Sequence, residues 1–401
     1  MQIRRVSAEE RPVTNLPLSA YAFFPSPVPS ETLATQARDH VSYGAGNVTL
    51  IAEEAGRTVA TVTAIPMRQN VRGRVYPMAG IASVSTHPLA RRQGHIRALL
   101  PRLLGELRDD GHPISALYPF RSSFYQRFGY IGLPKPPTVS FSPADLAPLL
   151  RADLPGEIGW EHIRDGFDGY RGFVDHLLSR RHGFGRLPDH HAARLRDKVD
   201  RWLVTARVDG ELVGALTYRI SDHGADLIGD DLLTTGPLGR ALLLQFFARH
   251  VDQVARVSVT VDPDEAPEQW LTDLTFVSES RVAFPMSAAP MARVLSIEAL
   301  AGMPVGPGRV TVTVVDDPLI AGEYLLDGAS GELGVSRVGA TVPGARVPAA
   351  TLTVPGLSGL VYGVLDPAEL ALRGLGTVPD DAAGELRGIF PHRRPYLMAQ
   401  F

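Results

Sequence analysis

The chain of 401 residues is long enough for two or three domains, each with its own buried core. Its net charge of −3 argues against a wholly basic protein that binds nucleic acid by neutralising phosphates. It contains no cysteine, which excludes disulfides, thiolate metal sites, iron–sulfur clusters and a cysteine nucleophile. No apolar run approaches the roughly 18 residues of a membrane span, and no secretory signal follows the charged start. We therefore expect a cytoplasmic protein without a membrane partner.

A series of predicted elements occurs twice along the chain. Residues 48–65 and 202–220 each read as two apolar strands around a turn, Ala55-Gly56 in the first copy and Asp209-Gly210 in the second. Such turns predict β-hairpins. Each hairpin is followed by a strand, an amphipathic helix and a short strand, predicted at 78–84, 96–107 and 114–118 and again at 227–233, 238–247 and 257–261.

The remainder, from about residue 291, follows a different pattern. Apolar alternation predicts strands, and short amphipathic runs predict helices; the strands are 309–315, 323–326 and 350–354, and the helices 290–299, 367–372 and 380–386. The final residues, 395–401, are mostly apolar and carry no net side-chain charge. Disordered tails are usually polar, so we expect this one to be held against the protein.

The segment 83–130 carries the chemical information. A predicted strand ends near Val84, and the run from Arg91 to Arg97 opens the amphipathic helix with Gly94 near its start. Free N–H groups at a helix N-terminus bind phosphate, and flanking arginines add charge-assisted hydrogen bonds. This arrangement suits a pyrophosphate. Neither a Walker loop nor the Rossmann glycine fingerprint is present.

This segment resembles the acetyl-CoA-binding motif of the GNAT acetyltransferases, Arg/Gln-x-x-Gly-x-Gly/Ala. Arg91 and Gly94 match it, whereas Ile96 replaces the last small residue. The run R-R-x-G-x-x-R, here residues 91–97, and the signature Φ-Y-x-R-F-G-Y, here residues 124–130 with Φ an apolar residue, are both present. With these motifs and the aromatic chain end at Phe401, the whole chain resembles the Eis (enhanced intracellular survival) N-acetyltransferase family.

The Eis resemblance implies an α/β architecture with tandem GNAT folds, each a mixed sheet with helices, and an α+β C-terminal domain like sterol carrier proteins. We expect a catalytic GNAT domain at 1–145, a degenerate one at 146–288 and the sterol-carrier-like domain at 289–401. The second copy reads T-G-P-L-G-R at 235–240 and lacks the paired arginines. The resemblance also implies a homohexamer.

The implied reaction is acetyl transfer from acetyl-CoA to a primary amine, by direct attack in a ternary complex without a metal. The resemblance makes Tyr125 the general acid, since a phenol with a pKa of about 10 stays protonated at neutral pH. The residues alone favour the other interpretation, in which Tyr125 is a half-buried packing residue. The general base is implied to be the α-carboxylate of Phe401, which requires burial or a proton relay because its ordinary pKa is about 3.5. The implied acetyl-CoA contacts are Val84, Ser85, Thr86, Arg92, Gln93, Gly94, His95, Ile96, Arg97, Phe120 and Arg121.

Other motifs are weaker. The histidines at 176, 182, 190 and 191 lack the spacing of a zinc site, and the arginine-rich stretch 180–201 lacks the interleaved aromatics of a nucleic-acid surface. The acceptor could be an aminoglycoside-like amine, another polyamine or a lysine. Relatives that acetylate aminoglycosides can carry an acid before the last residue, and here that residue is the neutral Gln400. The alternatives are an inactive acyl-CoA- or lipid-binding protein and an acyltransferase for longer acyl-CoA or protein lysines.

Overall fold

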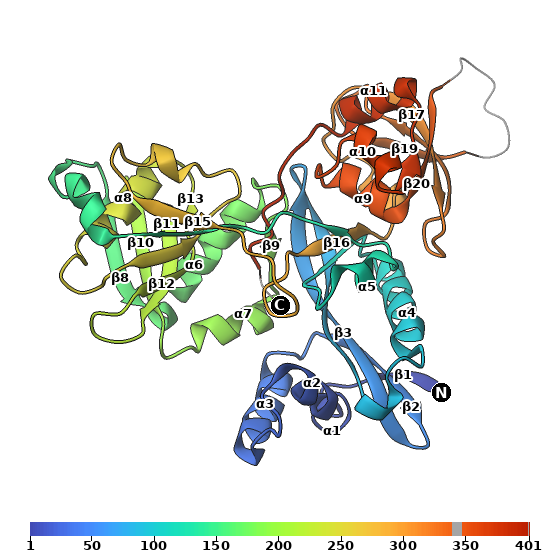
Figure 1. The fold of residues 1–401 in the computed structure, drawn as a ribbon, viewed down its shortest axis with the longest axis horizontal. Coiled ribbons are helices and arrows are strands. Elements are labelled where there is room, and N and C mark those ends of the chain that lie inside the picture. Colours follow the sequence, from blue (N-terminus) through green and yellow to red (C-terminus); the bar gives the residue numbers. More distant parts are fainter. Residues whose placement is uncertain (339–346, 400) are drawn as a thin grey trace. The chain divides into compact units, whose positions relative to one another are not determined.

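The computed structural model describes residues 1–338, 347–399 and 401, so Gln400 lies outside the described residues. The chain forms two compact units (Figure 1). The first comprises residues 1–133, 181–192 and 284–401, and the second comprises 134–180 and 193–283. These limits differ from the expected boundaries at 145 and 288. Position 145 falls inside a 3₁₀ helix, Pro143–Arg151, and the chain returns to the first unit for residues 181–192.

The first unit is built on an eight-stranded sheet in the order β1-β2-β3-β4-β5-β16-β6, with β9 paired to β3. All neighbours are antiparallel except β4 and β5. The strands are β1 Gln2–Val6, β2 Val48–Glu54, β3 Arg57–Val71, β4 Arg74–Thr86, β5 Ile114–Leu117, β6 Ile131–Gly132, β9 Gly185–Arg186 and β16 Met291–Val294. The predicted turn at 55–56 is confirmed, and both of its residues have positive φ, as a tight hairpin requires.

Side chains alternate between the two faces of this sheet, because the side-chain period of a strand is two. Ala79, Ile81 and Leu117 pack on one face with α4 (His95–Asp109), whose buried leucines fill that core. Met78 and Ala116 point to the other face and join a core shared with the C-terminal part of the chain. The sheet is therefore covered on both faces, and Figure 1 shows α4 running beside the blue strands.

The second unit contains an eight-stranded sheet in the order β15-β7-β14-β12-β11-β10-β8, with β13 paired to β11. Its strands are β7 Thr138–Phe141, β8 Glu157–His162, β10 Trp202–Val208, β11 Glu211–Ile220, β12 Leu227–Asp231, β13 Leu233–Thr234, β14 Val257–Thr260 and β15 Phe276–Glu279. The turn at Asp209-Gly210 also has positive φ at both residues. Helix α8, Pro237–Ala248, packs on this sheet much as α4 does on the first.

The two sheets share one topology, and each takes one strand from outside its own repeat in the sequence. A parallel pair, β4/β5 or β12/β14, lies at the centre of each, and a helix connects its two strands. Beside β5 stands β16, which follows the second repeat in sequence, whereas beside β14 stands β7, which precedes that repeat. The second repeat is thus complete only with a strand that comes before its own hairpin. This explains why the predicted boundary at 145, drawn from linear order, separates β7 from its sheet.

The C-terminal part forms a five-stranded sheet in the order β19-β18-β17-β20-β21, in which β17 and β20 are parallel. Its elements are β17 Arg309–Val315, β18 Gly322–Asp327, β19 Gly334–Arg337, β20 Ala349–Thr353, β21 Gly376–Thr377, α9 Val354–Val361, α10 Pro367–Leu372 and α11 Asp380–Ile389. The three predicted strands and the helices at 367–372 and 380–386 are confirmed. The predicted helix 290–299 is wrong, because this stretch holds β16, whose four residues are all buried. A short apolar run buried on both sides has no periodicity that distinguishes strand from helix.

The remaining α-helices connect the outer strands or follow β5. Between β1 and β2 lie α1 Arg11–Thr14, α2 Leu16–Phe23 and α3 Ser30–Ser42. Between β8 and β10, at the corresponding place in the second repeat, lie α6 Ile163–Leu178 and α7 Asp189–Arg196, and α5 Ser122–Gln126 follows β5. In the part of the chain that the structure describes, no helix is both long enough and apolar enough to cross a membrane.

Candidate active site

The strands β4 and β5 separate at the centre of the first sheet. Their parallel pairing ends where Ile81 opposes Leu117, but β4 continues to Thr86 while the chain leaves β5 toward α5. Beyond this point β4 is paired only with β3 on its other side. Main-chain groups of β4 that face away from β3 therefore have no strand partner beyond Ile81 and can bond to a ligand.

A β-bulge lies in the stretch of β4 that is paired with β3 alone. Thr61 opposes Ser85 and Thr63 opposes Ala82, so Ser83 and Val84 together face one residue of β3. Ser83 has a φ of +51°, a left-handed conformation that serine rarely adopts. Such bulges re-aim side chains and are frequent beside active sites. The Ser85 side chain is 5% exposed, and its Oγ has no hydrogen-bond partner among the described residues. A buried hydroxyl of this kind fits a polar ligand that lies along β4.

The N-terminus of α4 follows this strand and is open to an anion. Gly94 occupies the N-cap with a φ of +87°, no side chain caps the helix, and its first turn contains no acidic residue. Arg92 is also left-handed, with a φ of +64°. Left-handed residues in such turns are typical of backbone concavities that bind anions through N–H groups. A methyl group on Gly94 would meet nothing within 4 Å, so the glycine serves the backbone conformation rather than packing.

Between Arg92 and Arg97, some side chains are exposed and others are buried. Arg92 and Arg97 are exposed and have no ion-pair partner within the described ranges. Gln93 donates to the carbonyl of Leu89 at 3.1 Å. In contrast, the side chains of His95 and Ile96 are buried under the sheet, so only their main-chain N–H groups remain for a phosphate. The free cations and N–H groups lie on the same turn, as binding of a pyrophosphate requires.

Tyr125 lies in an aromatic cluster next to the end of β5. Its ring is 5.5 Å from Phe120, 5.0 Å from Phe124 and 6.2 Å from Tyr130, measured between centroids. Tyr125 is 3% exposed, and its hydroxyl has no partner among the described residues. Burial raises the pKa of Tyr125 above its ordinary value, so the phenol is protonated at neutral pH. Phe120 is 43% exposed, and Arg121 is exposed at the start of α5.

Phe401 lies on the face of the first sheet opposite to α4, against β4 and the end of β5. Its ring meets Tyr118 in an edge-to-face contact with centroids 5.5 Å apart. The Tyr118 hydroxyl donates to the carbonyls of Ala399 and Leu397, at 3.2 and 3.4 Å. Residues 118–120 thus connect the chain end to the ring cluster around Tyr125. The expectation that the apolar tail is held against the protein is confirmed, with Tyr396, Leu397 and Ala399 buried.

The second repeat lacks these features at the same place. Its helix α8 begins after Gly236 with Pro237, which has no N–H to offer a phosphate. Arg240 in its first turn pairs with Glu265 at 2.8 Å, and the Trp270 Nε1–H donates to the same carboxylate at 3.1 Å. The guanidinium of Arg240 also lies 5.9 Å from the Trp270 ring. This cation is neutralised inside its own unit, in contrast to Arg92 and Arg97.

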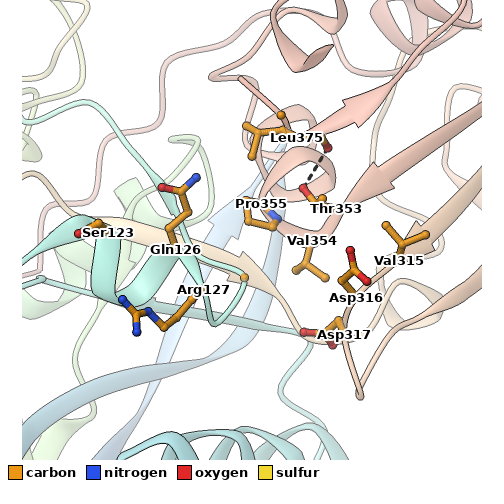
Figure 2. A pocket seen from close by; sticks show the side chains of 12 residues that line it. Ser123, Gln126, Arg127, Val315, Asp316, Asp317, Thr353, Val354, Pro355 and Leu375 are labelled. Atoms are coloured by element: carbon orange, nitrogen blue, oxygen red, sulfur yellow. Dashed lines mark hydrogen bonds between the residues drawn. The ribbon is translucent and has the colours of Figure 1, made fainter. Parts of the chain in front are cut away.

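A separate pocket of about 430 Å³ lies on the other side of α5. Figure 2 shows Ser123, Gln126 and Arg127 on one of its walls and Asp316 and Asp317 on another. Ser123 and Arg127 project from the face of α5 opposite to Tyr125, because residues two apart on a helix point in different directions. Tyr125 itself is not among the lining residues, but the Arg127 guanidinium lies 5.4 Å from the centroid of the Phe124 ring, which belongs to the cluster around Tyr125. No group of three or more histidine, aspartate or glutamate side chains suited to a metal occurs in the described ranges.

Two residues of this region, Gly80 and Tyr118, were not predicted from the sequence. A methyl group on Gly80 would lie 3.1 Å from the Phe401 ring and 2.6 Å from the Met67 sulfur. A glycine within a predicted strand is a signal of close approach by another segment, but it does not identify that segment. Tyr118 ended a predicted strand, and nothing in its local sequence indicates a partner almost three hundred residues away.

Comparison with known proteins agrees with this geometry. Residues 2–131 match the family described as "Acetyltransferase (GNAT) domain". An uncharacterized N-acetyltransferase of Streptomyces coelicolor is 28% identical over 244 residues, covering 55% of this chain and 57% of that protein. The chain thus matches little more than half the length of this curated relative.

Two solved structures share the whole fold. A GCN5-related N-acetyltransferase from Kribbella flavida has a TM-score of 0.81 at 24% identity, covering 100% of this chain and 98% of that one. Eis1 from Mycobacterium abscessus has a TM-score of 0.78 at 19% identity, with 100% of both chains covered. The strand order, the split central pair and the family match together identify residues 2–131 of this chain as a GNAT acetyltransferase domain.

Proposed function

We propose that the protein transfers the acetyl group of acetyl-CoA to a primary amine. The observation that carries this proposal is the position of the uncapped, arginine-flanked start of α4, which follows the end of β4 that has lost its pairing with β5. The pyrophosphate would be bound by the N–H groups of residues 94–97 with Arg92 and Arg97. The pantetheine would lie along Val84, Ser85 and Thr86, with Phe120 and Arg121 on the facing segment. The orphaned Oγ of Ser85 supports this path.

In the proposed reaction, the nitrogen of a neutral amine attacks the thioester carbonyl carbon. A C–N bond forms, the C–S bond breaks and its electron pair leaves on sulfur. Tyr125 gives its phenolic proton to that sulfur, and the surplus proton of the amine passes to the α-carboxylate of Phe401, directly or through water. The burial that keeps the Tyr125 phenol protonated and the contact of Phe401 with Tyr118 support these roles. Because the chain has no cysteine, a cysteinyl acyl-enzyme is impossible, which favours direct transfer.

We further propose an enzyme of the Eis type, with a degenerate second GNAT domain and a C-terminal domain like sterol carrier proteins. The neutralised Arg240 supports the loss of acetyl-CoA binding in the second repeat. Its acceptor would be an aminoglycoside-like amine, a polyamine or a lysine, its assembly a homohexamer and its location the cytoplasm, where acetyl-CoA is available.

Thiol release from acetyl-CoA in the presence of an amine panel tests this proposal. We expect release that depends on the amine and yields stoichiometric N-acetyl product by mass spectrometry. Propionyl-, butanoyl- and longer acyl-CoA in the same assay measure the acyl preference, and a lysine peptide tests a protein acceptor. Tight acetyl-CoA binding with no amine-dependent release would instead favour an acyl-CoA-binding protein.

A further inference from the structure

A short segment of the chain, residues 182–186, lies between β3 and the C-terminal tail. We call it the clip. It comes from the middle of the sequence and returns to the first unit between two parts of the second. On one side its strand β9 pairs with β3, where Arg68 opposes Arg186 and Gln69 opposes Gly185. On the other side the main-chain carbonyl of His182 accepts a hydrogen bond from the N–H of Tyr396 at 2.9 Å.

The backbone of Gly183 is fixed to β3 at both of its polar groups. Its N–H donates to the carbonyl of Asn70 at 2.7 Å, and its carbonyl accepts from Nε2 of Gln69 at 2.9 Å. The side-chain oxygen of Gln69 in turn accepts from the Tyr362 hydroxyl at 2.8 Å. Both β3 residues are fully buried, so this part of the clip cannot shift without breaking buried hydrogen bonds.

The tail lies directly against Gly183. A methyl group built there would be 2.6 Å from both the Cα of Pro395 and the N of Tyr396, and closer still to the Cβ of Pro395. These are main-chain and ring atoms that cannot rotate away. Gly185 meets the tail less tightly, since its methyl group would be 2.9 Å from the end of the Leu397 side chain. The clip thus sets the distance between β3 and the tail.

From this geometry we propose that Gly183 and Gly185 are positioning residues for the C-terminal residue. The clip fixes Pro395 to Leu397, Tyr118 holds the carbonyls of Leu397 and Ala399, and the Phe401 ring then reaches Gly80 and Tyr118. If the tail is displaced at Pro395, Phe401 is displaced with it. This inference rests on the proposed role of the Phe401 carboxylate as general base.

The test is a graded series of glycine-to-alanine variants with Gly111→Ala as the matched control. Gly111 has a φ of +88°, close to the +80° of Gly183, but a methyl group there would meet nothing within 4 Å. Both variants therefore carry the same backbone strain, and only Gly183→Ala moves the tail. Since a misplacement of about 1 Å can cost about 10²-fold in rate, we expect kcat of Gly183→Ala to fall at least about tenfold. The KM for acetyl-CoA should stay within about twofold, because the start of α4 is untouched.

Gly185→Ala should lie between Gly183→Ala and Gly111→Ala, and it serves as the principal variant if Gly183→Ala does not fold. Carboxypeptidase A gives a readout that does not depend on activity. Phenylalanine should be released faster from Gly183→Ala than from the parent or from Gly111→Ala, with melting temperatures recorded for all. Equal kcat and equal release in Gly183→Ala and Gly111→Ala would overturn the positioning role.

Deletion of Phe401 separates this inference from the proposed function. An inactive deletion variant beside a fully active Gly183→Ala would refute the clip and leave the base assignment standing. A fully active deletion variant would refute the base assignment, and with it this role of the clip. A parent protein that transfers no acetyl group to any amine would refute the proposed function itself.

Discussion

The ring of Phe401 lies where a side chain on Gly80 would otherwise stand. A methyl group on Gly80 would be 3.1 Å from Cε2 and 3.2 Å from Cδ2 of that ring. Gly80 is paired with Ala116 one position before β4 and β5 lose their pairing. The last residue of the chain is therefore held next to the point at which the central strands separate.

We expect a C-terminal extension to abolish acetyl transfer and an N-terminal tag to leave it unchanged. An extension converts the Phe401 carboxylate into an amide and places polar groups against a buried surface, which is costly. Removal of Phe401 should also be severe, because the new carboxylate ends up to about 3.5 Å of chain short of its place. The assay is the initial rate with a saturating amine, next to the melting temperature. A folded, extended enzyme with the parent rate would show that the base is another group.

Tyr125→Phe retains the ring and removes the proposed proton donor. General acid catalysis is worth about 10²–10⁴-fold, so kcat should fall by that factor with the KM for acetyl-CoA nearly unchanged. Tyr130→Phe is the control: Tyr130 is also buried, but its hydroxyl is hydrogen-bonded to Ser115 at 2.7 Å. That variant should lose about 1 kcal/mol of stability and little rate. A kcat of Tyr125→Phe within about threefold of the parent would make Tyr125 a packing residue.

Sequence periodicity predicted the elements made of local signals and missed those defined by distant partners. The hairpin turns at Gly56 and Gly210 and the helices α4 and α8 follow from turn chemistry and helical spacing. In contrast, β7 and β16 are short strands completed by segments far away in sequence, and so the boundary at 145 and the helix at 290–299 were misplaced. The start of α4 could be predicted because its signal, a glycine among arginines before an amphipathic run, is also local. The contacts of Gly80 and Gly183 with the tail depend on the tertiary fold alone.

Arg92→Ala should weaken acetyl-CoA binding without unfolding the protein. The Arg92 side chain has no partner among the described residues to lose, whereas a hydrogen bond to a charged group contributes about 1.5–3 kcal/mol, or at least about tenfold in Kd. Calorimetric titration at two salt concentrations measures this effect, and the difference between parent and variant should shrink as salt screens the exposed charge. Arg240→Ala, in the second repeat, should leave the Kd unchanged. Equal affinities of the parent and Arg92→Ala would remove Arg92 from the pyrophosphate site.

Arg293→Ala should be strongly destabilising, because Arg293 pairs with Asp317 at 3.0 Å with side chains only 2% and 8% exposed. Arg293 also donates to the carbonyl of Phe128, which follows α5. Removing one member of a buried pair costs about 3–5 kcal/mol, since the remaining charge is left uncompensated. Arg387→Ala is the control, as its pair with Asp366 is about half exposed and should contribute at most about 1 kcal/mol. Urea midpoints compare the two, and similar losses would contradict the burial argument.

The stability of the protein should fall as the pH drops from about 6.5 toward 4, owing in part to His182. Nδ1 of His182 accepts the Arg72 N–H at 3.0 Å, and therefore Nε2 carries the proton and donates to the carbonyl of Tyr362 at 2.9 Å. Burial lowers the pKa of His182 to about 4, from 6.5 in the unfolded chain. Between these values the unfolded state binds a proton that the folded state rejects, so stability is complete above 6.5 and is lost as the pH falls. The total is about 3 kcal/mol.

Other histidines add to the same trend, and His182→Gln isolates this one, because glutamine offers an acceptor and a donor but does not titrate. Urea unfolding from pH 4.5 to 7.5 should give a flatter profile for His182→Gln than for the parent. Parallel profiles would show that His182 does not contribute.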